Sequence, residues 1–457
     1  MRFIGIDIGT TSLCGVAIDT NTGRILESIT RDNRAHLPGR HAWEKLQAPD
    51  AIAASVRSLV NTLLKVSSPC AGIGITGQMH GMLYVDKHGA AVSPLFTWQD
   101  SRAGLACSGQ KTYAQLLCDL TGLAAAPGFG LATHFYNIRN KLVPRTAVFL
   151  CTIGDYAVMK LTQGKVPVMD PTNSASLGLF NLEKLRFDTS TLMQARLRPS
   201  LIPNLVSSGT HIGVTTGNVP VFAALGDNQA SVLGSLRSVK NSLLVNMGTG
   251  GQVSAFLPSY LRLKGLDLRP FPGSGYIAVG ASLCGGKAYA LLADFFQHVC
   301  REMAGTSARN IYARMEKAAR IAPDRFPSLL VDTRFCGTRD NPSLCGAINT
   351  ITLDNLQPGA LIRGVLAGMA HELHEYYRMM PGAVVKKMTM LVGSGNGVRK
   401  NPLLGKILEK TFGMRMRVPL YCEEAALGAA LCAGVGAGRF KDFFDAGSVL
   451  RYINYHQ

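Results

Sequence analysis

The amino-acid sequence predicts an α/β protein made of two similar halves, and three observations carry that prediction. The chain has 457 residues, which is long for a single hydrophobic core and fits two or three domains at about 150 residues each. A pattern of strand, Gly-Thr turn and strand opens the chain and starts again near residue 240. Amphipathic helices follow the strands in both halves. We therefore expect one domain over residues 1–238 and a second over residues 239–457.

The first half begins with β-rich runs at residues 3–8 (FIGIDI) and 13–19 (LCGVAID), which a polar turn separates. This pattern predicts antiparallel strands. Apolar residues then recur at helical spacing through residues 49–66, so an amphipathic helix follows. GIGIT at 72–76 and VPVFAAL at 219–225 are apolar runs that we expect to form further buried strands.

The second half repeats this plan, with expected strands at residues 242–248 and 252–257. A long helix is expected over residues 363–380, and a strand over 388–397 ends in a glycine-rich turn. Residues 401–413 have asparagine at the N-cap position, proline in the first turn and glycine at the end, so they form a helix.

The charge of the chain is strongly positive. Lysine and arginine outnumber aspartate and glutamate by 47 to 29, which gives a formal net charge of +18 at pH 7. The surface therefore favours anions in general. The basic residues are spread without a dense run, and no zinc-finger spacing or aromatic-basic RNA motif occurs. We expect no nucleic-acid partner and attribute the charge to solubility or non-specific attraction.

Cysteine usage and hydropathy bear on location. The 11 cysteines occur without a C-x-x-C pair, a usage typical of reduced thiols in the cytoplasm. No basic and apolar signal region precedes the first strand. The most apolar stretch, residues 425–438, is shorter than the about 20 residues that cross a bilayer. We expect a cytoplasmic protein without a membrane partner. The sequence predicts no particular oligomeric state.

Three glycine-rich turns are candidate phosphate sites, at residues 9–12 (GTTS), 248–251 (GTGG) and 393–397 (GSGNG). Such turns let backbone N–H groups approach a phosphate closely. Each turn alone is more typical of a plain hairpin or a strand-to-helix turn, and no P-loop sequence is present. Their order along the chain is the informative feature. Asp7, beside the first turn, could bind Mg²⁺ directly or through a water molecule, or simply initiate the turn.

The stretch AALGDNQAS at residues 223–231 places Asp227 directly after an apolar run. An ionised carboxylate at a strand end is costly to desolvate unless something binds or uses it. One interpretation is a helix N-cap, which the following Asn-Gln-Ala-Ser suits. The other is a catalytic carboxylate, and the local sequence alone leaves both open.

Six motifs in order, DIGTTS, GQMHG, WQDSR, GDNQAS, MGTGG and GSGNG, resemble those of the FGGY carbohydrate kinases, a family of the actin-like ATPase superfamily. The resemblance runs from about residue 3 to about residue 437. It implies an α/β fold of two ribonuclease-H-like domains, with ATP and a sugar meeting in the cleft between them. It also implies that Mg²⁺ accompanies ATP.

The resemblance assigns roles by motif position. Asp227 corresponds to the general base, and Asp7 lies where Mg²⁺ would be held. The residues on the sugar side are Gln78, Met79, His80, Trp98, Asp100 and Asn228. The positions for phosphate and adenosine are Thr10, Thr11, Gly248, Thr249, Gly395 and Asn401. Without the family context, His80 and Trp98 would more commonly be core residues.

The sugar is a finer question. The stretches at residues 128–141, 152–181 and 280–290 are most similar to family members that phosphorylate sedoheptulose. The GTGG turn and Asn228 look more like members that phosphorylate D-xylulose. We expect an ATP-dependent kinase of a ketose primary hydroxyl, giving sedoheptulose 7-phosphate, with D-xylulose 5-phosphate as the alternative product. An alternative from another class is an actin-like sensor that binds ATP and sugar without phosphoryl transfer.

Overall fold

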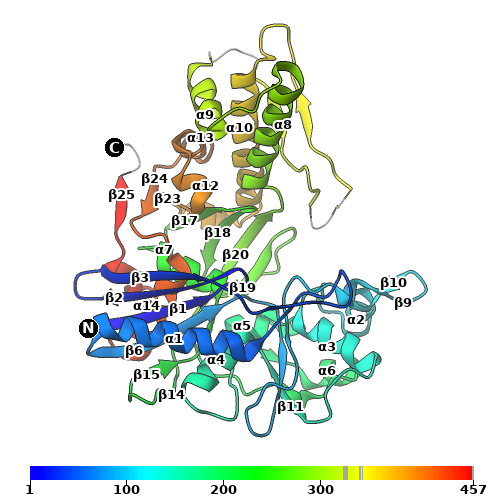
Figure 1. The fold of residues 1–457 in the computed structure, drawn as a ribbon, viewed down its shortest axis with the longest axis vertical. Helices are drawn as coiled ribbons and strands as arrows, with labels where there is room; N and C mark the ends of the chain where they lie inside the picture. Colours follow the sequence, from blue (N-terminus) through cyan, green and yellow to red (C-terminus); the bar gives the residue numbers. More distant parts are fainter. Residues whose placement is uncertain (323–327, 339–340, 342, 455–457) are drawn as a thin grey trace.

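The computed structural model describes residues 1–322, 328–338, 341 and 343–454, and its framework is two mixed β-sheets, one above the other in Figure 1. The first sheet has the strand order β14-β15-β6-β1-β2-β3, and β16 pairs with β6 next to β15. Its strands are β1 (Arg2–Ile8), β2 (Ser12–Asp19), β3 (Arg24–Asp32), β6 (Cys70–Gly77), β14 (His211–Val214), β15 (Pro220–Phe222) and β16 (Leu225–Gly226).

The second sheet repeats the topology of the first. In the first, β1 and β2 and then β2 and β3 are antiparallel, and β6 adds parallel to β1. In the second, β17, β18 and β20 are antiparallel in turn, and β23 adds parallel to β17. This duplication confirms the expected pair of similar halves. The strands are β17 (Ser242–Met247), β18 (Gly251–Leu257), β19 (Asp267–Pro270), β20 (Tyr276–Ser282), β23 (Met390–Ser394), β24 (Met416–Pro419) and β25 (Tyr452–Asn454).

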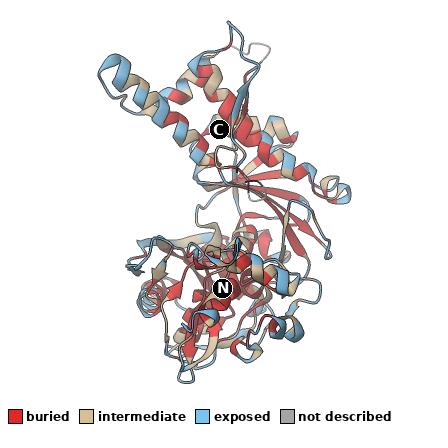
Figure 2. Ribbon diagram, turned by 90° about the vertical axis from the view of Figure 1, so that its right-hand side faces the viewer, coloured by how far each residue is buried: buried red, intermediate tan, exposed pale blue. Residues whose placement is uncertain are grey.

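Helices cover both faces of the first sheet, which explains why its strands are nearly continuous apolar runs. One face packs against α1 (Pro49–Ser67) and α4 (Ile153–Leu161). The other packs against α7 (Asp227–Ser235) and α14 (Glu424–Gly436), whose apolar residues join a core shared by both sheets. Figure 2 shows the buried residues concentrated along the sheets and the helices that cover them.

The helix pair α7 and α14 packs at backbone distance, although the two helices are almost 200 residues apart in the chain. A Cβ atom on Gly234 would overlap the carbonyl oxygen of Glu424, and one on Gly428 would overlap that of Ala230. Glycine therefore allows an approach that no other residue would permit. The same holds for Gly5, where β1 meets α14. The last long helix of the chain thus rests on the first sheet, between the two halves.

The remaining elements decorate these halves. In the second half, α8 (Gly286–Ala304), α9 (Ile311–Ile321), α10 (Pro358–Arg378) and α13 (Pro402–Phe412) enclose a second large core. The other helices are α2 (Tyr113–Thr121), α3 (Gly130–Arg139), α5 (Pro171–Ser176), α6 (Thr189–Gln194), α11 (Gly382–Val385) and α12 (Gly395–Arg399), with 3-10 turns at Arg102–Gly104, Pro199–Leu201 and Asp445–Val449. The short strands are β4 (His36–Leu37), β5 (Leu46–Gln47), β7 (Leu83–Asp86), β8 (Leu95–Phe96), β9 (Ala106–Ser108), β10 (Lys111–Thr112), β11 (Ala147–Cys151), β12 (Phe180–Asn181), β13 (Arg186–Phe187), β21 (Leu330–Asp332) and β22 (Ala347–Asn349).

Most expected elements are present, and two differ for local reasons. The strand expected at 219–225 is split into β15 and β16, because Val221 pairs with Ile73 while Leu225 pairs with Thr76. One extra residue on this side makes a bulge. The segment GSGNG at 393–397, expected as a turn, consists instead of the last two residues of β23 and the first three of the short helix α12. The expected boundary at residues 238 and 239 falls between α7 and β17.

Among the helices that the structure describes, none has the length and apolar character needed to cross a membrane.

Candidate active site

Three predicted site segments follow strands that end at one edge of the first sheet. The strands β1, β6 and β16 are parallel neighbours, and their last residues align, since Ile8 and Gly226 both pair with Gly77. The Gly-Thr turn therefore leaves this edge after β1, Gln78 starts the segment after β6, and Asp227 follows β16. Parallel strand ends that share an edge are where α/β proteins bind ligands.

The other two glycine turns leave one edge of the second sheet. There β17 and β23 are parallel, with Asn246 opposite Ser394, so the Gly248 turn and Gly395 lie side by side. Gly395 has φ of 81°, and a Cβ there would crowd the carbonyl oxygen of Met247 at 2.7 Å. The start of α12 is thus packed against the backbone at the end of β17, and glycine is required there.

The second turn is also held by the start of α8. The backbone N–H of Gly286 donates to the carbonyl oxygen of Gly248 at 2.9 Å, and that of Lys287 donates to Thr249 at 3.0 Å. The first residues of this long helix therefore lie directly behind the turn. The partial positive charge of a helix N-terminus favours an anion nearby.

The two edges meet around Asp227 and Asn228. The side-chain amide of Asn228 donates to Oε1 of Gln252, on β18, at 3.0 Å. The positive charge of Arg269, on β19, acts on Asp227. Residues of the second sheet therefore face the start of α7, and the predicted segments of both halves converge there.

Asp227 is the first residue of α7 and does not cap it. The N-cap position is Gly226, and no side-chain cap bond is formed there, so the N-cap interpretation of Asp227 is wrong. Burial raises the pKa of Asp227 to about 6, while Arg269 and the backbone N–H of Asn228 oppose that rise. At neutral pH this carboxylate is mostly ionised and still a useful proton acceptor.

Asp7 lies at the same edge, and its environment suits a cation. Burial, followed by repulsion from Asp227 and Glu423, raises its pKa to about 7. Its Oδ1 is buried with no hydrogen-bond partner among the described residues. No cluster of three or more metal-ligating side chains occurs in the described part of the chain. One carboxylate that leaves room for water and phosphate ligands is a common arrangement for Mg²⁺.

Trp98 is joined by a hydrogen bond to the first Gly-Thr turn. Its indole N–H donates to the hydroxyl of Thr10 at 2.9 Å, and that hydroxyl donates to Oε1 of Gln78 at 3.3 Å. Trp98 is 47% exposed, so the core-packing alternative is wrong for this residue. Thr11, the next residue of the turn, is exposed.

Met79 and His80 follow β6 and are held firmly. The sulfur of Met79 lies so close to Gly226 that a Cβ there would be 2.9 Å from it, which places Met79 beside the start of α7. His80 has φ of 70°, an uncommon conformation that the surroundings must support. Its Nδ1 lies 2.7 Å from the carbonyl oxygen of Ser176, and its ring stacks on Phe129 with 4.6 Å between centroids.

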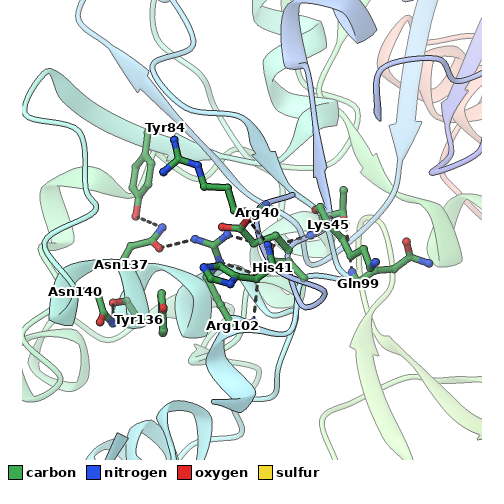
Figure 3. A network of polar contacts seen from close by, with 12 residues as sticks. Arg40, His41, Lys45, Tyr84, Gln99, Arg102, Tyr136, Asn137 and Asn140 are labelled. Atoms are coloured by element: carbon green, nitrogen blue, oxygen red, sulfur yellow. Dashed lines mark hydrogen bonds and ion pairs between the residues drawn. The ribbon is translucent and has the colours of Figure 1, made fainter. Parts of the chain in front are cut away.

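Asp100 is buried, and its carboxylate forms hydrogen bonds with other residues of the protein. Its two carboxylate oxygens accept from Nε and Nη2 of Arg102 at 2.7 and 3.0 Å, and one also accepts from the backbone N–H of Lys45. Figure 3 shows the network continuing from Arg102 to Asn137 and then to Tyr84. Contact of Asp100 with substrate stays a prediction, and the observed bonds give it a supporting role.

Asn401 is the N-cap of α13, where its side chain accepts a hydrogen bond from the backbone N–H of Leu404 at 3.1 Å.

Several residues at the site belong to no motif that the sequence analysis recognised. Glu423 and Arg269 act on the two aspartates, and Gln252 holds Asn228. They come from segments that only the tertiary fold brings to this edge.

Two sheets of the same topology, which meet beside a buried carboxylate and have glycine-rich segments at their strand ends, define the actin-like ATPase class. Comparison with known proteins agrees. The models for the N-terminal and C-terminal domains of the FGGY family of carbohydrate kinases match residues 2–234 and 243–437. The chain belongs to the FGGY family of carbohydrate kinases, whose members are ATP-dependent phosphotransferases.

The names of the similar proteins state different phosphate acceptors. A human sedoheptulokinase is 28% identical, with 94% of this chain and 96% of the relative covered. A glycerol kinase of Photorhabdus laumondii is 26% identical, with 96% and 90% covered. The solved xylulose kinase of Rhodospirillum rubrum has a TM-score of 0.85 at 20% identity, covering 99% of this chain and 93% of that one. Glycerol kinase of Plasmodium falciparum, solved with ADP, has a TM-score of 0.81 at 18% identity, covering 98% and 92%.

Proposed function

We propose that this protein transfers the γ-phosphoryl group of ATP to the terminal primary hydroxyl of a ketose, with sedoheptulose as the preferred acceptor. The observation that carries the proposal is Asp227, an ionisable carboxylate at the convergence of the glycine turns. The domains would be residues 1–238 and 239–457, each contributing one edge of the site. The similarity to a sedoheptulokinase over nearly the whole of both chains supports the choice of sugar.

The residues suggest a direct transfer. Asp227 accepts the proton of the sugar hydroxyl, whose oxygen forms a bond to the γ-phosphorus as the bond to the β-phosphate oxygen breaks and ADP leaves. Backbone N–H groups of the turns at Thr10, Thr11 and Thr249 orient the phosphates, while Gly248 donates its own N–H to the carbonyl oxygen of Gly250 at 3.0 Å and so shapes the second turn. Mg²⁺, held at Asp7 directly or through water, would neutralise phosphate charge.

The sugar would lie against Gln78, Met79, His80 and Trp98, with Asn228 at its end nearest the base. The buried Oδ1 of Asn228 has no hydrogen-bond partner within the described residues, so it can accept a hydrogen bond from a sugar hydroxyl. The same asparagine is the feature that favours D-xylulose as the alternative acceptor, since it resembles the residue in kinases of that sugar.

The test is a panel of kcat/KM values for sedoheptulose, D-xylulose, ribulose and glycerol, with ADP release measured and the phosphorylated product identified by mass spectrometry. We expect sedoheptulose to give the highest value and Asp227→Asn to lower kcat by about 10²- to 10⁴-fold. A highest value for D-xylulose would replace the preferred acceptor. Binding of ATP and sugar without turnover would favour the sensor.

A further inference from the structure

A closed ring of hydrogen bonds joins the first phosphate turn to the segment after β6. The hydroxyl of Thr10 donates to Gln78, and Nε2 of Gln78 donates to Oε1 of Gln47 at 2.8 Å. Nε2 of Gln47 then donates to the carbonyl oxygen of Thr10 at 2.8 Å, which closes the ring. Trp98 is attached to it through the Thr10 hydroxyl.

The ring limits the hydrogen bonds that the hydroxyl of Thr10 can form with a ligand. A hydroxyl has one proton to donate, and here that proton goes to Gln78 while one lone pair accepts from Trp98. It therefore has no proton left for a phosphate oxygen. The exposed Thr11 and the backbone N–H groups of the turn remain for that purpose.

Gln47 is the member that fixes the ring in place. Its side chain is fully buried, at 0% exposure, and both ends of its amide are used. Its short strand, β5, pairs with β8, where Gln47 is opposite Leu95, three residues before Trp98. The backbone that carries Gln47 and the backbone that leads to Trp98 are therefore one small sheet.

We propose that Gln47 is a positioning residue that couples occupation of the sugar site at Trp98 to the geometry of the phosphate turn at Thr10. The inference rests on the proposed function, because it takes Trp98 as a wall of the sugar site. Sugar that settles against Trp98 restrains the indole, and the indole restrains the Thr10 hydroxyl. The ring passes this restraint to the backbone of the turn, so sugar and ATP each favour binding of the other.

The restraint passes through the bonds of the ring one after another, so the expected size of the coupling is that of one hydrogen bond, although Gln47→Leu removes two. Breaking the ring at Gln47 should lower the factor by which saturating sugar tightens nucleotide binding by about two- to twelvefold, which corresponds to about 0.5 to 1.5 kcal/mol for one net hydrogen bond. The affinity for nucleotide in the absence of sugar should change by a smaller factor than the coupling does.

The experiment measures binding of a non-hydrolysable ATP analogue with Mg²⁺ by calorimetry, with and without saturating sedoheptulose, and kcat and KM in parallel. Gln47→Leu removes both amide bonds at similar volume, and Gln47→Glu keeps the acceptor for Gln78. Thr10→Val removes the hydroxyl, and Thr10→Ser should restore the coupling. Trp98→Phe removes the indole N–H and shortens the ring but keeps an aromatic face.

Asn33 provides the matched control. Its side chain donates to the carbonyl oxygen of Gly9 at 2.9 Å, so it supports the same turn without joining the ring. Asn33→Ala should weaken nucleotide binding equally with and without sugar. Melting temperatures of all variants check folding, and if Gln47→Leu does not fold, the comparison of Thr10→Val with Thr10→Ser decides the question.

The outcomes separate the two proposals. If the wild type transfers phosphate and shows coupling, but Gln47→Leu and Thr10→Val keep it unchanged, the ring has no such role. If Asn33→Ala lowers the coupling as much as Gln47→Leu does, the effect is general loosening of the turn and the inference is wrong. A wild type without turnover on any sugar contradicts the proposed function, whereas loss of coupled binding in Gln47→Leu would still support the ring.

Discussion

The proton acceptor can be tested through the pH dependence of kcat/KM. If Asp227 acts as the base, it must be ionised, so activity should fall as the pH drops through its pKa of about 6. About nine-tenths of the carboxylate is ionised at pH 7 and about one-tenth at pH 5, so kcat/KM should fall about tenfold between them. The assay is initial-rate ADP release from pH 5 to 9 at saturating ATP.

Two variants show which carboxylate is responsible. Arg269→Gln removes the positive charge that opposes the burial of Asp227, so the pKa of Asp227 should rise and the acid limb should move to higher pH. The residual activity of Asp227→Asn should lack this limb. Because the pKa of Asp7 is also raised, to about 7, profiles at several magnesium concentrations are needed. A limb due to Asp7 should move with magnesium more than a limb due to Asp227.

The reasoning would be refuted by an acid limb near pH 6 that persists unchanged in Asp227→Asn. It would equally be refuted if Arg269→Gln moved the limb to lower pH, since loss of a positive charge cannot make a carboxylate more acidic.

Three further predictions concern stability and magnesium. Gly428→Ala places a methyl group against the carbonyl oxygen of Ala230 and should lower the free energy of unfolding by about 1 to 3 kcal/mol or more, as a lower urea midpoint would show. Asp100→Asn leaves the buried guanidinium of Arg102 without an ionised partner, which should cost about 3 to 5 kcal/mol in the same measurement. Asp7→Asn should raise the magnesium concentration for half-maximal activity by about tenfold or more, in a titration of the initial rate. An unchanged midpoint or half-maximal concentration would contradict the corresponding prediction.

The sequence predicted well which residues lie at the strand ends. A residue next to the end of a buried strand is placed wherever the sheet places that strand. Asp7, Gln78 and Asp227 each come within two residues of the end of an apolar run. Once β1, β6 and β16 pair in parallel, their register brings these residues to one edge. Motif order and strand topology are therefore enough to predict this part of the site.

Contacts made across the fold could not be predicted in the same way. Gln47 lies in a two-residue strand, and Arg269 lies on β19, at one end of the second sheet. Neither position has a local pattern that differs from an ordinary surface residue. Asp227 was ambiguous for another reason, since carboxylates are favoured both at the N-cap and in the first turn. If α7 began one residue later, Asp227 would be its N-cap instead of a residue of its first turn.

The position of Asp227 is fixed by backbone packing more than by side-chain bonds. The helix that starts at Asp227 meets α14 through glycines, and α14 meets β1 in the same way, so Asp227 is rigidly tied to the first sheet. The polar contact of the start of α7 with the second sheet is the hydrogen bond from Asn228 to Gln252 at 3.0 Å, while the apolar residues of α7 pack in the core that both sheets share. Because a hydrogen bond breaks more easily than a close-packed helix pair, movement between the two sheets would change this bond first. Asp227 would keep its place beside Asp7 while the turn at Gly248 approached or withdrew, so that such a movement would set the distance between Asp227 and that turn.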